Sequence, residues 1–241
     1  IQVVFLILGG LVTTYLALNT VSGGEGFISG LNTVFEAVPE RFEMILDKSN
    51  PEYKNLPGLG VLVGGMWVAN LYYWGFNQYI IQRTLAAKSL KEAQKGILLA
   101  AALKLVIPLI VVIPGIAAYV MINDAETMTR LGDVALHNLP SLEQADRAYP
   151  WLLQFLPTGL KGLAFAALAA AIVSSLASML NSTSTIFTMD IYKQYINKNA
   201  SDKATVNTGR MSAFVALVIA CVVAPLLGNL DQAFQFIQEY T

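Results

Sequence analysis

Several polar side chains of this sequence lie inside long apolar stretches, where they could bind a small solute. Asn70, Tyr73 and Asn77 recur at i, i+3 and i+7, a spacing that places them on one face of a helix. An amide can form paired hydrogen bonds to hydroxyls, and an aromatic ring can stack on a flat C–H surface. This face therefore suits a sugar. The alternative is that Asn70 hydrogen-bonds to another helix while Tyr72 and Trp74 join an aromatic belt at the membrane surface.

Lys104 is a second candidate, because it lies well inside the apolar stretch 97–122. A lysine that faces lipid at mid-depth costs about 3 kcal/mol, so its ammonium would be expected to face a ligand or a polar cavity. The other interpretation is that the side chain extends toward the inner membrane surface, roughly 10 Å away at 1.5 Å per helical residue.

A third set of residues could bind a cation. Ala171, Ser174 and Ser175 lie at i, i+3 and i+4, on one face of a helix. One carbonyl and two hydroxyls are neutral oxygen donors, which a hard monovalent cation such as Na⁺ accepts. A polar stripe continues from Ser174 through Ser178, Asn181, Ser182 and Thr185. The alternative is close helix packing, with each hydroxyl bonded to the preceding turn.

The elements that must position these residues are membrane-spanning helices. The chain has 241 residues, of which 55% are hydrophobic and 13% charged; soluble domains carry about 25% charged residues. Stretches of about 20 apolar residues predict five full spans and the start of a sixth. We place them at about 1–21, 56–81, 97–122, 151–188 and 210–228, with the start of the sixth at 231–241. Because the chain begins without Met inside an apolar run, we expect a fragment of one longer transmembrane domain.

The loops between the spans predict the orientation. Residues 82–96 and 190–209 are basic, whereas 22–55 and 123–150 are rich in acidic residues. Short cytoplasmic loops are enriched in Lys and Arg, so the two basic loops face the cytoplasm. Glycines around Asn70 favour a break in the second span, and Pro108 and Pro114 favour kinks in the third. The net charge of −1 gives no indication of a nucleic-acid partner.

The sequence QRTLAAK at 82–88, followed by Ala93, resembles the sodium/glucose cotransporter group of the sodium:solute symporter family. The stretch 169–193 resembles the sodium-site helix of that family, and the likeness is strongest to bacterial sodium/galactose symporters. This resemblance implies an all-α, leucine-transporter-like inverted-repeat fold. It also implies that the remaining helices of the full-length transporter, which supply further ligands, are partners of this chain.

The resemblance further implies residue roles. Asn70, Lys104 and Gln238 would bind the sugar, with Tyr73 stacked beneath it as an inner gate and Trp74 beside it.

Phe234 would belong to the outer gate, and the Ala171 carbonyl with the Ser174 and Ser175 hydroxyls would bind sodium. We expect sodium-coupled symport of a hexose, galactose or glucose, by alternating access in a lipid bilayer. The location would be the plasma membrane, as a multi-pass protein of the bacterial inner membrane.

Three alternatives remain. The substrate could be an amino acid, a vitamin or an anion, because Lys104 leaves a carboxylate conceivable. The chain could also be a sensor or scaffold that does not transport. An enzyme is the weakest interpretation, because the spans contain no nucleophile–base pair, HExxH motif or metal-ligand cluster.

Overall fold

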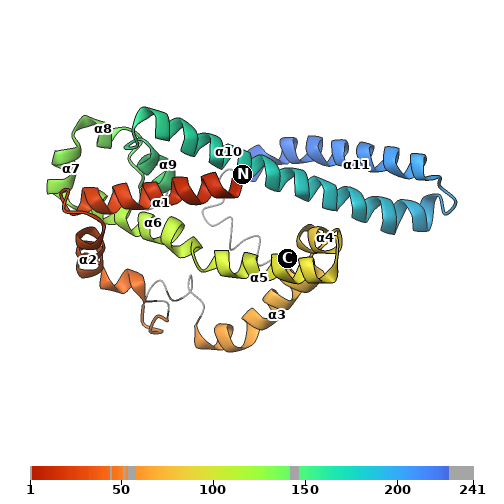
Figure 1. Ribbon diagram of the computed structural model, residues 1–241, viewed down its shortest axis with the longest axis horizontal. Helices are drawn as coiled ribbons and strands as arrows, with labels where there is room; N and C mark the ends of the chain where they lie inside the picture. The colour runs from red at the N-terminus through yellow and green to blue at the C-terminus, as the bar shows by residue number, and fades with distance from the viewer. Residues whose placement is uncertain (1, 44, 51–52, 54–57, 142–146, 228–241) are drawn as a thin grey trace. The chain divides into compact units, whose positions relative to one another are not determined.

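The computed structural model describes residues 2–43, 45–50, 53, 58–141 and 147–227, and every described element is a helix (Figure 1). The chain divides into two compact units. Unit 1 comprises residues 1–73 and 88–171, and unit 2 comprises residues 74–87 and 172–241. Among the described residues, four helical stretches are long and apolar enough to cross a membrane: Val3–Val21, Leu90–Asn123, Thr158–Ile196 and Asp202–Leu226.

Unit 1 contains most of the helices. They are α1 (Gln2–Val21), α2 (Phe27–Ala37), η1 (Pro39–Phe42), η3 (Val61–Gly65), α3 (Met66–Leu71), α5 (Leu90–Lys104), α6 (Ile107–Asn123), α7 (Ala125–Leu131), α8 (Asp133–Leu136), α9 (Ala148–Leu153) and the first part of α10 (Thr158–Ile186). Unit 2 contains most of η4 (Tyr72–Phe76), then α4 (Gln78–Leu85), the rest of α10, η6 (Phe187–Ile196), α11 (Asp202–Val223) and η7 (Ala224–Leu227). The predicted span 151–188 thus corresponds to α9, a short connection and α10 with the start of η6.

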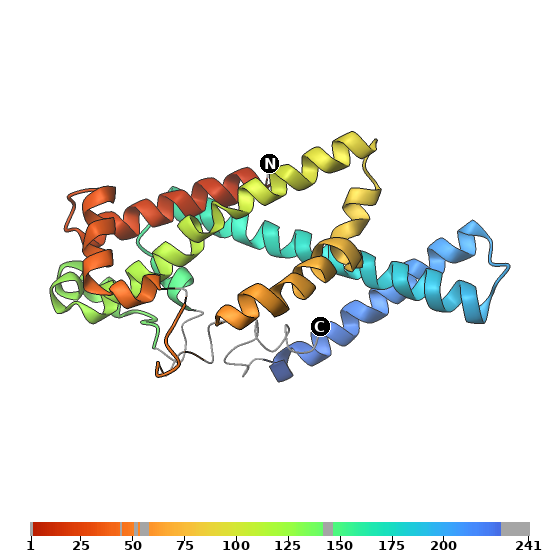
Figure 2. The same cartoon turned by 90° about the horizontal axis from the view of Figure 1, so that it is seen from below.

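The hydrophobic core of unit 1 lies where α1 and α6 run side by side and α2 packs against the end of α1 (Figures 1 and 2). Leu18, Val34 and Met121 are almost completely buried there. Trp151 of α9 closes this core, and its indole N–H donates a hydrogen bond to the Ala135 carbonyl at 3.0 Å. The short helix α2 is amphipathic, and Gly30 and Val34 form its buried face.

The third hydrophobic stretch is interrupted directly after Lys104, where α5 ends and two residues precede α6. Pro108 explains the break, because a proline ring collides with the carbonyl of residue i−4, which is Lys104 here. Leu105 and Val106 instead bond to the Ala102 and Leu103 carbonyls at 3.1 and 3.0 Å. Pro108 therefore places Lys104 at the last position of a helix.

The predicted break in the second span is confirmed at Asn77, which separates η4 from α4. Asn77 has extended backbone angles (φ −74°, ψ 112°), and its side-chain oxygen accepts a hydrogen bond from the Tyr79 N–H at 3.0 Å. Asparagine is among the best N-capping residues, so it begins a new helix here. The expectation that Asn77 continues the helical face of Asn70 and Tyr73 is therefore wrong.

Candidate functional site

The first predicted sugar-binding residue, Asn70, lies on α3 with an exposed side chain. Its amide nitrogen donates a hydrogen bond to the Met66 carbonyl one turn earlier, at 2.9 Å. The adjoining segments η3 and η4 are π-helical, with one extra residue in each turn. Such segments often occur at functional sites, because the wider turn changes where the following side chains point.

Lys104 and Tyr73 are brought together within unit 1. The Lys104 Nζ lies 4.7 Å from the centroid of the Tyr73 ring, which is a cation–π contact. Lys104 ends α5 and Tyr73 lies in η4, so the two side chains come from different helices. Tyr73 is 37% exposed, so part of its ring is accessible. An ammonium and a partly open ring are groups that can hold hydroxyls and a C–H face, respectively.

The other predicted sugar and gate residues are only partly described. Trp74 follows Tyr73 in η4 and is half-buried. Gln238 and Phe234 lie outside the described residues, and their roles stay predictions.

The predicted sodium residues Ala171, Ser174 and Ser175 lie together on α10, each partly exposed. They share one face of a continuous helix, with the two adjacent serines one turn after Ala171. The Ser174 carbonyl accepts a hydrogen bond from the Ser178 hydroxyl at 3.0 Å. A carbonyl has two lone pairs and the serine hydroxyls are acceptors, so the face can offer neutral oxygens to a cation.

A second group of polar residues was not predicted as a site from the sequence. In unit 2, the Gln82 side chain of α4 contacts α10 at two points. Its nitrogen donates to the Ser178 carbonyl at 3.1 Å, and its oxygen accepts from the Asn181 amide at 2.8 Å. Arg83 donates to the Ser178 hydroxyl. The sequence signals were that Gln82 and Arg83 begin the family-like motif QRTLAAK, and that Ser178 and Asn181 belong to the polar stripe.

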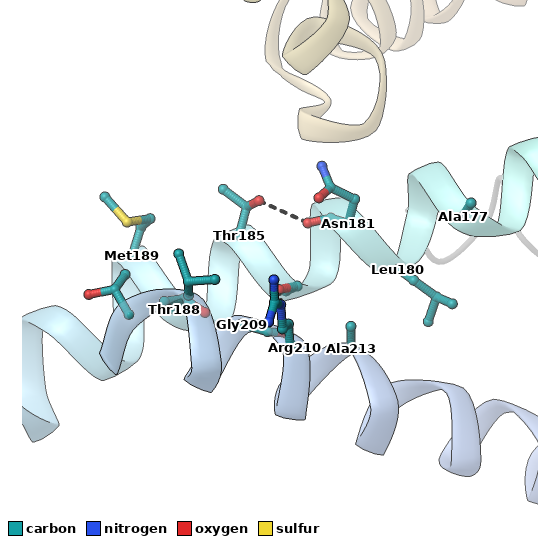
Figure 3. Close-up of a pocket in the computed structure, with 12 residues that line it drawn as sticks. Ala177, Leu180, Asn181, Thr185, Thr188, Met189, Gly209, Arg210 and Ala213 are labelled. Carbon is teal, nitrogen blue, oxygen red and sulfur yellow. Dashed lines mark hydrogen bonds between the residues drawn. The ribbon is translucent and has the colours of Figure 1, made fainter. Parts of the chain in front are cut away.

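An open groove of about 490 Å³ lies between α10–η6 and α11 (Figure 3). Asn181 and Thr185 of the predicted polar stripe line it, as does Arg210. The Ser184 hydroxyl donates to the Gly209 carbonyl at 2.7 Å, so the helices approach closely at this glycine. Thr188, only 4% exposed, also lines the groove. These α11 contacts could not be read from the sequence, because nothing in the local pattern of α10 specifies its neighbour.

Comparisons with known proteins place the chain in a family. The family model described as sodium:solute symporter family matches residues 1–240. The sodium/glucose cotransporter of Vibrio parahaemolyticus is 66% identical over the whole chain, which covers 44% of that protein. The uncharacterized symporter YidK of Escherichia coli (strain K12) is 36% identical over 94% of the chain, which covers 36% of that protein. The chain thus spans less than half the length of these two relatives.

A solved structure shows the fold. It is the substrate-bound, outward-open state of a Na⁺-coupled sialic acid symporter, which superposes with a TM-score of 0.72. The likeness covers 95% of this chain and 46% of that one, at 23% sequence identity. The all-α, leucine-transporter-like fold expected from the sequence is therefore confirmed.

Proposed function

The chain belongs to the sodium:solute symporter family, and from this premise we propose that it is part of a secondary active transporter of hexoses. The transporter carries galactose or glucose together with Na⁺ by alternating access. It lies in the plasma membrane as a multi-pass protein, the inner membrane in a bacterium. The chemistry is binding and movement rather than catalysis of a covalent step.

The contact between Lys104 and Tyr73 is the observation that carries the sugar proposal. Lys104 supplies up to three N–H donors, whereas the exposed part of the Tyr73 ring offers a flat apolar surface. A hexose presents hydroxyls at its edge and C–H groups on its faces, so it needs both. Asn70 adds an amide from α3, and Gln238 would add a second amide. Trp74 lies beside the stacking ring.

The sodium proposal is supported by the neutral oxygens of α10. The Ala171 carbonyl and the hydroxyls of Ser174 and Ser175 form one face of the helix. Three ligands do not complete the coordination shell of a hard cation, which takes about six oxygens or more. The remaining helices of the full-length transporter would supply the others.

Coupling requires that each ligand binds one conformation better than the other. In this proposal, Na⁺ favours the outward-facing state that also binds the sugar. The ion gradient then drives the sugar into the cell. Tyr73 forms the inner gate and Phe234 contributes to the outer gate. The break at Asn77 allows α4 to move as a short segment, because one extended residue can absorb a change in backbone angles.

The proposal is tested by galactose uptake into proteoliposomes that contain the full-length transporter. We expect uptake to require an inward Na⁺ gradient and to collapse when K⁺ replaces Na⁺. Equal uptake in the two salts would refute the coupling.

Competition by unlabelled glucose, myo-inositol, an amino acid and a carboxylate separates the substrate classes. The second candidate function is symport of another small solute, because the Lys104 ammonium would also pair with a carboxylate. Efficient competition by an amino acid or a carboxylate, without competition by glucose, would favour it. Ligand binding without flux would instead favour a sensor.

A further inference from the structure

The side-chain amide of Gln82 links α4 to α10 through both of its polar atoms. Its nitrogen donates to the Ser178 carbonyl at 3.1 Å and also approaches the Tyr79 carbonyl at 3.3 Å. Its oxygen accepts from the Asn181 amide at 2.8 Å. The Asn181 side chain projects from α10 on the side away from α11 (Figure 3). The two amides therefore join α4 to α10.

Ser178 extends this connection along α10 toward the proposed sodium residues. Its hydroxyl accepts a hydrogen bond from Arg83 of α4 and donates one to the Ser174 carbonyl at 3.0 Å. A serine hydroxyl has a single proton, so this donation fixes its direction. We call Gln82, Arg83, Ser178 and Asn181 the α4–α10 network. It ends on the backbone of Ser174, which is itself a proposed sodium ligand and precedes Ser175.

The segment α4 is suited to respond to such a connection. It has only eight residues and begins directly after the extended residue Asn77. A few residues at the end of an element commonly act as hinges, because they absorb changes in φ and ψ. The network holds the opposite part of α4, near its C-terminal end, against the sodium-carrying helix. The position of α4 and the geometry of α10 near Ser174 are thus mechanically connected.

We propose that Gln82 and Asn181 are positioning residues of the sodium site, which hold α4 on α10 in the state that binds Na⁺. This inference rests on the proposed function. Sodium binding at Ser174 and Ser175 then favours the α4 position that the network stabilises, and loss of the network weakens sodium binding. A link of equal strength in every state would leave sodium affinity unchanged, because only differential stabilisation shifts an equilibrium.

The test compares Gln82→Leu, Asn181→Leu and the double variant in full-length transporter reconstituted into proteoliposomes. The readouts are the half-saturating Na⁺ concentration for galactose uptake and the KM for galactose at saturating Na⁺. We expect each single variant to raise the half-saturating Na⁺ concentration about threefold or more. This is the effect expected from the loss of one average interhelical hydrogen bond in a membrane. The galactose KM at saturating Na⁺ stays within about twofold, because the sugar contacts are intact.

The double variant shows whether Gln82 and Asn181 act through their shared hydrogen bond or independently of each other. Since Gln82 and Asn181 share one hydrogen bond, the double variant should resemble the stronger single variant rather than multiply both effects. Thr183→Val is the matched control, because its hydroxyl donates only within α10, to the Met179 carbonyl at 3.0 Å. It should leave the half-saturating Na⁺ concentration unchanged.

Gln82→Glu keeps the size of the side chain in case the leucine variants do not fold. It still accepts from Asn181 but cannot donate to the Ser178 carbonyl when ionised, so it should also raise the half-saturating Na⁺ concentration. Unchanged sodium dependence in folded Gln82 and Asn181 variants overturns the inference, as do multiplied effects in the double variant. In both cases the wild type still shows sodium-driven uptake. Uptake by the wild type without Na⁺ would instead refute the proposed function.

Discussion

The Lys104 ammonium lies 4.7 Å from the centroid of the Tyr73 ring, although the two residues belong to different helices. A cation over an aromatic face gains about 0.5–2 kcal/mol, depending on how far water is excluded. The contact orients the ammonium next to the ring that is proposed to stack on the sugar. Lys104 would therefore bind the solute and also position Tyr73.

Replacing Lys104 tests this arrangement directly. We expect Lys104→Met to reduce galactose uptake at least tenfold, because it removes every donor while keeping a long apolar chain. Lys95→Met is the control. Lys95 is exposed and pairs with Glu92 at 3.0 Å, and such surface pairs contribute about 0–1 kcal/mol. Near-normal uptake by Lys104→Met would contradict the assigned role.

The aromatic partner can be examined with two substitutions. Tyr73→Phe keeps the ring, and Tyr73→Leu removes it. If stacking and the cation–π contact are what the site needs, Tyr73→Phe should retain severalfold more uptake than Tyr73→Leu. Equal loss in both variants would assign the role to the hydroxyl. Both are measured as initial rates of galactose uptake at saturating Na⁺.

Asn70 offers a matched comparison with another asparagine. Asn70 donates to the carbonyl four residues earlier at 2.9 Å, and Asn123 at the end of α6 does the same at 2.8 Å. We expect Asn70→Ala to lower galactose uptake about 100-fold, because the variant lacks the amide that would hydrogen-bond to a sugar hydroxyl. Asn123→Ala should transport normally. Equal effects of the two substitutions would mean that Asn70 acts only on its own helix.

The hydroxyl of Ser175 is predicted to bind Na⁺. Ser175→Ala should raise the half-saturating Na⁺ concentration about tenfold or more, because interactions with charged groups contribute about 1.5–3 kcal/mol. Ser175→Thr keeps the hydroxyl and should stay closer to the wild type. The measurement is uptake as a function of Na⁺ at fixed ionic strength. An unchanged Na⁺ dependence in Ser175→Ala would remove this residue from the site.

The lowered pKa of Asp124, in the loop after α6, predicts that the stability of the folded protein depends on pH. The Thr127 hydroxyl, followed by the Thr127 backbone N–H at 3.0 Å, holds the pKa of Asp124 below its usual range. A lowered carboxyl pKa stabilises the folded state above the unfolded value of about 3.9, and this contribution is lost as pH falls through the folded pKa.

Asp124→Asn isolates this contribution, because asparagine also caps helices but does not titrate. The difference in melting temperature between the wild type and Asp124→Asn, measured in detergent, should be constant between pH 7 and pH 5. It should shrink below about pH 4, where the wild-type carboxylate becomes protonated. Asp124→Ala should cost about 1 kcal/mol of cap stability at pH 7. A constant difference down to pH 3 between wild type and Asp124→Asn would contradict the carboxyl's role.

The sequence by itself determined the helical, membrane-spanning class and much of the local structure. Twenty-residue apolar stretches require helices, because a helix satisfies its own backbone in lipid. Glycines around Asn70 predicted an interrupted second span, and Pro108 predicted a kink in the third, where the helix ends at Lys104. Each of these signals acts within one or two helical turns. The role of Asn77 was wrong because an asparagine can either continue one helix or cap the next. Both patterns depend on the same few neighbouring residues, and the hydrogen bond from the Tyr79 N–H shows that Asn77 is a cap.

Only the tertiary structure decided which of these residues meet. The bond between Asn181 and Gln82 joins positions 99 residues apart, and the Lys104–Tyr73 contact joins two separate helices. Periodicity assigns each side chain to a face of its own helix but does not say which helix covers that face. That choice depends on packing and hydrogen-bond satisfaction summed over whole helices, so it arises only when the chain is folded.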